Sequence, residues 1–165
     1  MARRLSFFGA PRKDFHAGGA HIAVFVVPVF EGRLVAFDVQ APGVEGRFLP
    51  WTVLAFGGNP YADASLLMDD WCQGALASLR LVDVIGERRA EGSHELAIVF
   101  RAELTAAPAG DAHRTPVHLS PEDLESINDF APADLQRWVE AGEQPQPGPP
   151  IPPPADKDDG PKLVF

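Results

Sequence analysis

The chain has 165 residues and a formal net charge of −9. Its length suits one domain, and a composition of 45% hydrophobic and 22% charged residues excludes a wholly disordered chain. The negative charge argues against binding to a nucleic acid duplex, because such affinity comes from Lys and Arg side chains that neutralise phosphates.

Three β-strands are predicted in the first part of the chain. The runs "HIAVFVVPVF" (21–30) and "RLVAFDV" (33–39) are rich in β-branched and aromatic residues. Glu31-Gly32 separates them, a two-residue link that is typical of a β-hairpin. The run "FLPWTVLAF" (48–56) predicts a third strand, which Gly57-Gly58 interrupts.

A helix is predicted over residues 63–79, where apolar residues recur at a spacing of three or four. They are Ala64, Leu67, Trp71, Ala75 and Leu79. Asp63 stands where a residue that caps the helix is expected.

Two more strands and two more helices are predicted after this helix. The runs "LRLVDVIGE" (79–87) and "HELAIVFRAEL" (94–104) indicate strands joined by the polar turn "RRAEGS" (88–93). The segment 120–127 predicts a helix capped by Ser120, with Pro121 at its first position. A last short helix is expected over 132–142, and from about Glu140 the chain is dense in proline, which favours an extended or disordered tail.

This order of elements, with a Gly-Gly turn before the first long helix, resembles the Nudix hydrolase family over residues 20–140. The resemblance implies an α/β fold of the α/β/α sandwich type with a mixed β-sheet. It divides the chain into an N-terminal extension (1–19), a Nudix-like domain (20–140) and a Pro-rich tail (141–165).

The signature of that family is G-x5-E-x7-R-E-U-x-E-E-x-G-U, where U is a bulky aliphatic residue. The resemblance implies that its glutamates would hold divalent metal ions, since residues i, i+3 and i+4 of a helix converge on one place. Counted from Gly57, Asp63 takes the first acidic position and Leu79 the last aliphatic one. The paired positions hold Trp71-Cys72 and Ala75-Leu76 instead, and no shift of the register restores the carboxylates.

Three functions are compatible with this mismatch. The first is a non-catalytic module that binds a nucleotide-like small molecule or a protein partner, with no metal cofactor. Another is a structural or assembly module whose helix and sheet edges pack against a second copy of the chain. The alternative is an active hydrolase of nucleoside diphosphate derivatives, whose Mg²⁺ or Mn²⁺ would be bound by acids outside the signature. The candidates for that role are Glu87, Glu95, Glu103 and Glu125.

Three residues are candidates for ligand binding, and the sequence indicates no catalytic residue. Trp51 is near the Gly-Gly turn and could stack on a base, as could Phe48 and Tyr61, although core packing explains Trp51 equally well. Asp63 occupies an acidic signature position, and the guanidinium of Arg101 could bind a phosphate or pair with a surface acid.

The single cysteine, Cys72, excludes an intrachain disulfide framework and favours a reducing compartment, for which the cytoplasm is the simplest expectation. With no base near it in sequence, a packing role is expected for Cys72 rather than a nucleophilic one. The run "IAVFVVPVF" is too short to cross a bilayer, so no membrane role is expected.

Overall fold

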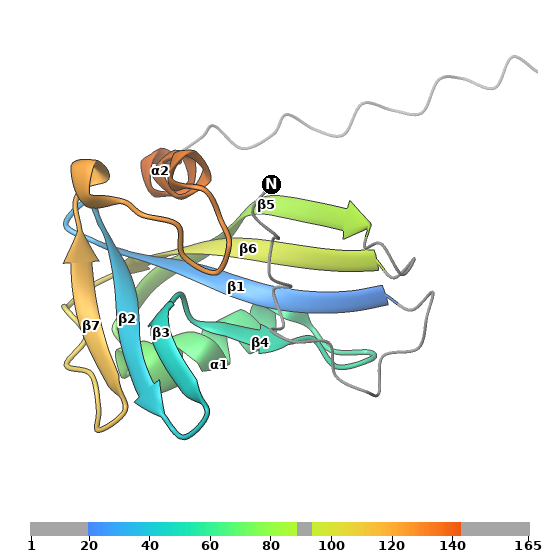
Figure 1. Ribbon diagram of the computed structural model, residues 1–165, viewed down its shortest axis with the longest axis horizontal. Coiled ribbons are helices and arrows are strands. Elements are labelled where there is room, and N and C mark those ends of the chain that lie inside the picture. Colours follow the sequence, from blue (N-terminus) through green and yellow to red (C-terminus); the bar gives the residue numbers. More distant parts are fainter. Residues whose placement is uncertain (1–19, 89–93, 143–165) are drawn as a thin grey trace, which may run out of the picture.

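The computed structural model describes residues 20–88 and 94–142 of the chain. Within them, seven strands form one sheet and two α-helices pack against it (Figure 1). The strands are β1 (Ala20–Phe30), β2 (Arg33–Ala41), β3 (Val44–Phe48), β4 (Trp51–Val53), β5 (Leu76–Arg88), β6 (His94–Leu104) and β7 (Arg114–Leu119). The helices are α1 (Pro60–Cys72) and α2 (Pro132–Glu140), with a 3₁₀ turn, η1 (Pro121–Asp123), between β7 and α2. None of the described helices is long and apolar enough to span a membrane.

The sheet is mixed, in the order β3-β2-β1-β6-β5, with β4 paired to β1 and β7 paired to β2. Strands β1 and β6 run parallel over their length, and the other pairs are antiparallel. The β1–β2 hairpin turns at Glu31 and Gly32, which both have positive φ angles, the conformation that two-residue hairpin turns require. The predicted hairpin is therefore confirmed.

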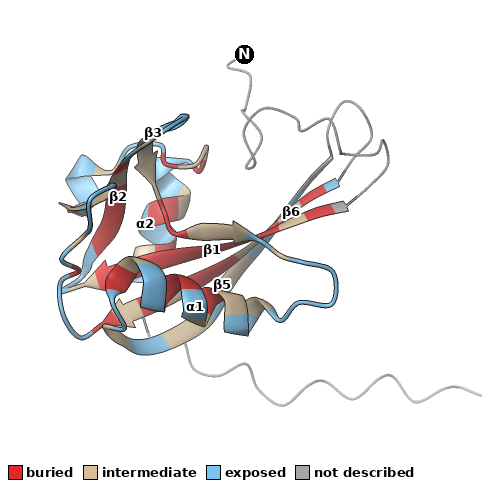
Figure 2. Ribbon diagram, turned by 90° about the horizontal axis from the view of Figure 1, so that it is seen from below, coloured by how far each residue is buried: buried red, intermediate tan, exposed pale blue. Residues whose placement is uncertain are grey.

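The two helices lie on opposite faces of the sheet, which gives the expected α/β/α sandwich (Figure 1). Strand β1 packs on both faces, because Phe25 and Val27 belong to the core under α2 while Val24 and Val26 belong to the core under α1. Figure 2 shows this burial along β1, and shows β5 and β6 continuing past α1. A strand that is buried on both faces has a continuous apolar sequence, and β1 has one.

The first helix differs from its prediction. It spans Pro60–Cys72 and is capped by Asn59, whose side-chain oxygen accepts a hydrogen bond of 2.9 Å from the Tyr61 amide. The helix ends because Gln73 and Gly74 adopt positive φ angles of 50° and 73°. The apolar spacing appeared to continue to residue 79 because the start of β5 also packs its side chains on the core under α1.

Three further predictions were wrong or incomplete. The predicted strand 48–56 is the end of β3 and the short β4, separated at Pro50, whose carbonyl accepts a hydrogen bond of 2.9 Å from the Val26 amide. The predicted helix 120–127 is only the turn η1, because the Ser120 hydroxyl bonds to the Asp123 side chain and caps no amide. Strand β7 was missed because it contains Pro116, which it tolerates by pairing with β2 alone among the described strands.

The last helix is close to its prediction of 132–142. The predicted N-terminal extension 1–19, most of the turn 88–93 and the tail from 143 onward lie outside the described residues.

Candidate functional site

The turn between β4 and α1 presents an aromatic side chain to solvent. The Gly58 amide donates a hydrogen bond of 2.8 Å to the Ala55 carbonyl, and Gly57 supplies the positive φ angle of 75° that the turn needs. A Cβ atom on Gly58 would lie 2.9 Å from that carbonyl oxygen, so the turn requires glycine there. Phe56 stands at its tip and is fully exposed.

One face of helix α1 is buried against the sheet. If the helix continued to residue 79, the paired signature positions would lie mainly on this face. Ala64, Leu67, Met68 and Cys72 are buried against the sheet. Cys72 is 1% exposed, and its burial raises the pKa of the thiol to about 12, although Arg114 acts in the opposite direction. Cys72 therefore packs in the core under α1, as expected from the sequence.

The end of α1 at Cys72 also decides how the signature can be placed. Counted from Gly57, the second acidic pair falls on Ala75-Leu76, in the turn after the helix and in β5. These two positions therefore do not share a helical face with Trp71-Cys72. To keep that pair on α1, the motif would have to begin at residue 53 or earlier, before either glycine of the turn.

The two adjacent acids near the end of α1 differ in their surroundings. Asp70 forms an ion pair with Arg114, with a shortest distance of 2.6 Å, and Arg114 also binds Asp111 and lies 4.8 Å from the centre of the Trp71 ring. The hydrogen bond that Arg114 donates to Asp70 is the main cause that raises the pKa of Arg114. Asp69 is exposed. The Asp70 carboxylate thus ties α1 to the start of β7.

The acids that could replace the signature glutamates do not form one metal-binding cluster among the described residues, although Glu87 of β5 is the register partner of Glu95 on β6. Glu103 pairs with Arg101 at 2.7 Å, and Glu125 pairs with Arg47. Glu95 is 2% exposed on β6. In residues 20–88 and 94–142, no group of three or more His, Cys, Asp or Glu side chains is arranged to hold a metal ion.

The three predicted ligand-binding residues do not meet in one site. Trp51 stacks on Phe25 at a centroid distance of 6.2 Å, in the core under α2. Arg101 lies on the same face, 14% exposed, and its Nε donates a hydrogen bond of 3.2 Å to the Val139 carbonyl of α2. Asp63 is on α1, across the sheet from both. A ligand touching all three would have to pass through the core, so any role they have in binding is separate.

No known family model matches the sequence, and no curated protein sequence matches it. Solved structures do match. A MutT Nudix hydrolase from Burkholderia pseudomallei is 18% identical, with a TM-score of 0.54 over 73% of this chain and 96% of that one. The MutT protein of Methanosarcina mazei Go1 is 12% identical, with a TM-score of 0.60 over 79% of this chain and 100% of that one.

The fold is Nudix-like. A third structure, the Nudix domain of Shewanella oneidensis NrtR in complex with ADP ribose, is 10% identical, with a TM-score of 0.51 over 78% of this chain and 90% of that one. At these identities the likeness concerns the fold, which does not by itself carry the chemistry.

Most of the arginines whose side chains the structure describes are already paired. Residues 20–142 contain no lysine. Four arginines form ion pairs with nearby acids: Arg47, Arg101, Arg114 and Arg137. Arg33 and Arg80 make no ion pair with another described side chain, and they are on different strands. A diphosphate would therefore find no ready-made cluster of cations among the described residues.

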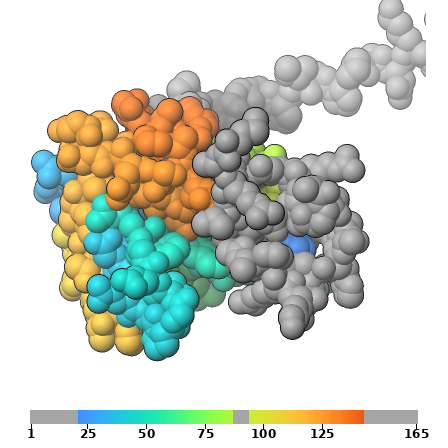
Figure 3. All heavy atoms as spheres, viewed as in Figure 1, coloured from blue at the N-terminus to red at the C-terminus, as the bar shows by residue number. Residues whose placement is uncertain are grey.

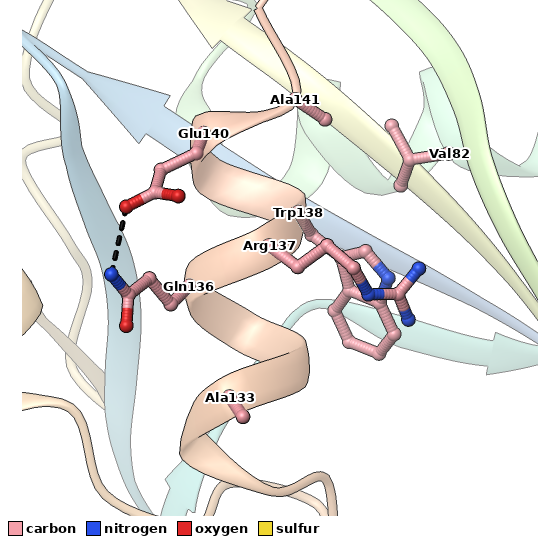
Figure 4. A pocket seen from close by; sticks show the side chains of 7 residues that line it. All are labelled: Val82, Ala133, Gln136, Arg137, Trp138, Glu140 and Ala141. Carbon is pink, nitrogen blue, oxygen red and sulfur yellow. Dashed lines mark hydrogen bonds between the residues drawn. The ribbon is translucent and has the colours of Figure 1, made fainter.

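A hollow of about 420 Å³ lies between α2 and β5 (Figure 4). It is lined by Val82, Ala133, Gln136, Arg137, Trp138, Glu140 and Ala141. Figure 4 shows Gln136 bonded to Glu140 on one side of the helix, at 2.8 Å, and Arg137 and Trp138 on the side toward Val82. Arg137 already pairs with Asp83 at 2.6 Å, so this hollow offers a ligand no free cation.

The C-terminal part of the domain is also fastened to β3. Arg47 binds Asp38 at 2.7 Å and Glu125, and the Asn128 side chain accepts a hydrogen bond of 2.7 Å from the Leu49 amide. In Figure 3 the segment that includes α2 (orange) lies directly against the segment that includes β3 and β4 (teal). These contacts account for Arg47 structurally.

Sequence reasoning missed Phe56. The signal was available, because a large apolar residue directly before Gly57-Gly58 stands at a turn, where exposure is the expected state.

Proposed function

We propose that this Nudix-like domain is a non-catalytic binding module. The observation that carries the proposal is the composition of α1. Its face toward the sheet is apolar, and of its three acids Asp70 is bound by Arg114. A Mg²⁺ or Mn²⁺ ion needs several oxygen ligands at one place, and Asp63 and Asp69 are six positions apart on the helix.

The exposed surface of the same turn and helix favours a protein partner. Phe56 is fully exposed, Leu66 is 65% exposed and Tyr61 is half exposed, although its ring also contacts Phe100 at 4.7 Å. Residues 48–79 contain no Lys, Arg or His. Exposed apolar side chains on a segment whose own charged residues are all acidic suit a protein surface that is itself apolar and basic.

A nucleotide-like ligand is the second candidate. The observation in its favour is the likeness to the NrtR Nudix domain, whose structure contains ADP ribose. Exposed Phe56 and Tyr61 could each stack on a base, although no phosphate-binding cluster accompanies them among the described residues. The third possibility, a hydrolase with Mg²⁺ or Mn²⁺ bound by relocated acids, is supported by the fold alone.

One set of experiments separates these functions. The full chain is incubated with ADP ribose and a panel of nucleoside diphosphate derivatives, with and without Mg²⁺ or Mn²⁺, and turnover is measured. Calorimetry measures in parallel the binding of each ion and of each compound. The proposal predicts no metal-dependent turnover and no heat of binding for either ion. Turnover of about one per second that chelator abolishes would refute it, since a bound ion contributes several kcal/mol to the transition state and each 1.4 kcal/mol is about tenfold in rate.

The compartment is also a proposal. The buried, unpaired Cys72 is compatible with a reducing environment, and we propose the cytoplasm. Fractionation of the source cells would test it.

A further inference from the structure

The turn after β4 leads directly into α1, and we call four side chains of these two segments the turn–helix surface. It consists of Phe56 at the tip of the turn and of Asp63, Leu66 and Asp69 on the helix. Leu66 lies three positions after Asp63 and three before Asp69, so the three side chains follow one side of the helix. The surface therefore combines two exposed apolar side chains with two carboxylates.

The charge of this surface is uncompensated at the end of α1. The last turn of the helix contains Asp69 and Asp70 and no basic residue. Acids at a helix C-terminus add to the negative end of the helix dipole, which is unfavourable unless a cation lies nearby. Arg114 compensates Asp70, whereas Asp69 has no ion-pair partner among the described side chains. A segment that supplied a cation here, together with apolar side chains for Phe56 and Leu66, would complement the surface.

The N-terminal segment of the same chain has this composition. Residues 1–19 lie outside the described part, and their sequence "MARRLSFFGAPRKDFHAGG" contains four basic and three phenylalanine residues. They are Arg3, Arg4, Arg12 and Lys13, and Phe7, Phe8 and Phe15. Residues 20–142, by contrast, contain no lysine.

The position where this segment joins the domain favours contact with the turn–helix surface. The Leu54 amide, two residues before Phe56, donates a hydrogen bond of 2.8 Å to the Ile22 carbonyl. The chain therefore enters β1 beside the turn. Nineteen residues can extend over roughly 60 Å, about three times the length of α1 at 1.5 Å per residue. The segment can reach every part of the surface.

We propose that residues 1–19 bind the turn–helix surface of their own molecule, with phenylalanine side chains on Phe56 and Leu66 and a basic side chain beside Asp69. Attachment through a short linker gives such a segment an effective concentration in the millimolar range, so weak contacts suffice. This proposal rests on the proposed function, in which the same surface binds a basic, apolar protein partner. Binding would then be regulated, because the partner must displace residues 1–19 before it can bind.

Limited proteolysis of the full chain tests this contact. Trypsin cleaves after Arg12 and Lys13, and the rate is followed by mass spectrometry. We expect cleavage at these sites to be at least tenfold faster in Phe56→Ser/Leu66→Ser and in Asp69→Lys than in the unsubstituted chain. Increasing the salt concentration should also accelerate cleavage of the unsubstituted chain, because exposed ion pairs are screened.

Two controls make the result specific. Val44→Ser changes an equally apolar, 48% exposed side chain on β3, and should leave the rate unchanged. Arg12→Glu/Lys13→Glu combined with Asp69→Lys should restore amide-exchange protection of the segment, which is measured instead because these changes remove the trypsin sites. Equal cleavage rates for the unsubstituted chain, the surface variants and the Val44 variant would overturn the proposal.

Protection that increases with protein concentration would overturn it as well, because the occupant would then be the segment of a second copy. The readout is cleavage and exchange, not turnover. A hydrolase could therefore still show the contact, and a non-catalytic module could lack it, so the two proposals fail independently.

Discussion

The attachment of α2 to β5 depends on one carboxylate, Asp83. Its side chain, 21% exposed, accepts hydrogen bonds of 2.9 Å from Trp138 Nε1 and 2.6 Å from Arg137, and of 2.9 Å from the Val84 amide. Burial raises the pKa of Asp83, but the hydrogen bonds from Trp138 and Arg137 outweigh it and leave that pKa below its usual value. We predict that Asp83→Ala destabilises the domain by about 2–3 kcal/mol.

The magnitude follows from what each donor loses. Trp138 is 1% exposed, so its indole N–H would be left buried without an acceptor, which costs about 1–3 kcal/mol. Arg137 is 57% exposed and would lose an ion pair worth less than about 1 kcal/mol. The Val84 amide is exposed and water can replace its acceptor. Most of the loss should therefore come from the indole.

Urea unfolding at pH 7 measures these terms, with Arg137→Ala as the matched control and Trp138→Phe to close a double-mutant cycle. We expect Arg137→Ala to cost less than about 1 kcal/mol, and Asp83→Ala to cost much less when residue 138 is already phenylalanine. The reasoning is refuted if Arg137→Ala is as costly as Asp83→Ala, or if the cycle shows no coupling between Asp83 and Trp138.

Three more predictions concern the rest of the domain. Cys72 should react with thiol reagents at pH 8 only as fast as the domain unfolds, because its thiol is buried with a pKa of about 12; fast labelling in the absence of urea would contradict this. The hydrogen bond from Arg47 lowers the pKa of Asp38, so its small stabilising effect should be present above about pH 4 and be lost as the pH falls below it. Asp38→Asn should reduce the acid dependence of the unfolding midpoint, and an unchanged dependence would exclude that role. Leu66→Glu should leave stability within about 0.5 kcal/mol while placing a carboxylate between Asp63 and Asp69 on α1, and weak Mn²⁺ binding by calorimetry, absent in the unsubstituted chain, would show it.

The sequence predicted the parts of the fold that local pattern decides. The two-residue hairpin, the continuous apolar run of β6 and the last helix have signals contained in their own residues. The end of α1 was missed because Leu76 and Leu79 continue the apolar spacing while belonging to a strand. Only the pairing with β6 shows that these leucines belong to a strand and not to a longer helix. Such a long-range contact cannot be inferred from the spacing of neighbouring residues.

The candidate site was less predictable, because its residues depend on which face of the sheet each strand presents. Trp51 and Arg101 point toward α2 and Asp63 lies on α1, an arrangement set by strand register. The ion pairs that occupy Arg47 and Arg114 join residues 78 and 44 positions apart in the chain. Only the charges themselves were visible in the sequence.

Helix α1 shows why a Nudix-like fold can form without carboxylates at the signature positions. Folding depends on its buried positions, where Met68 and Cys72 pack against the sheet and where a carboxylate would have to be desolvated. At an exposed position such as Leu66 the fold is nearly indifferent to whether the side chain is apolar or acidic. An exposed leucine on that face therefore adds little to stability. Together with the fully exposed Phe56 in the preceding turn, this leucine is better explained by contact with another segment or protein than by the requirements of folding.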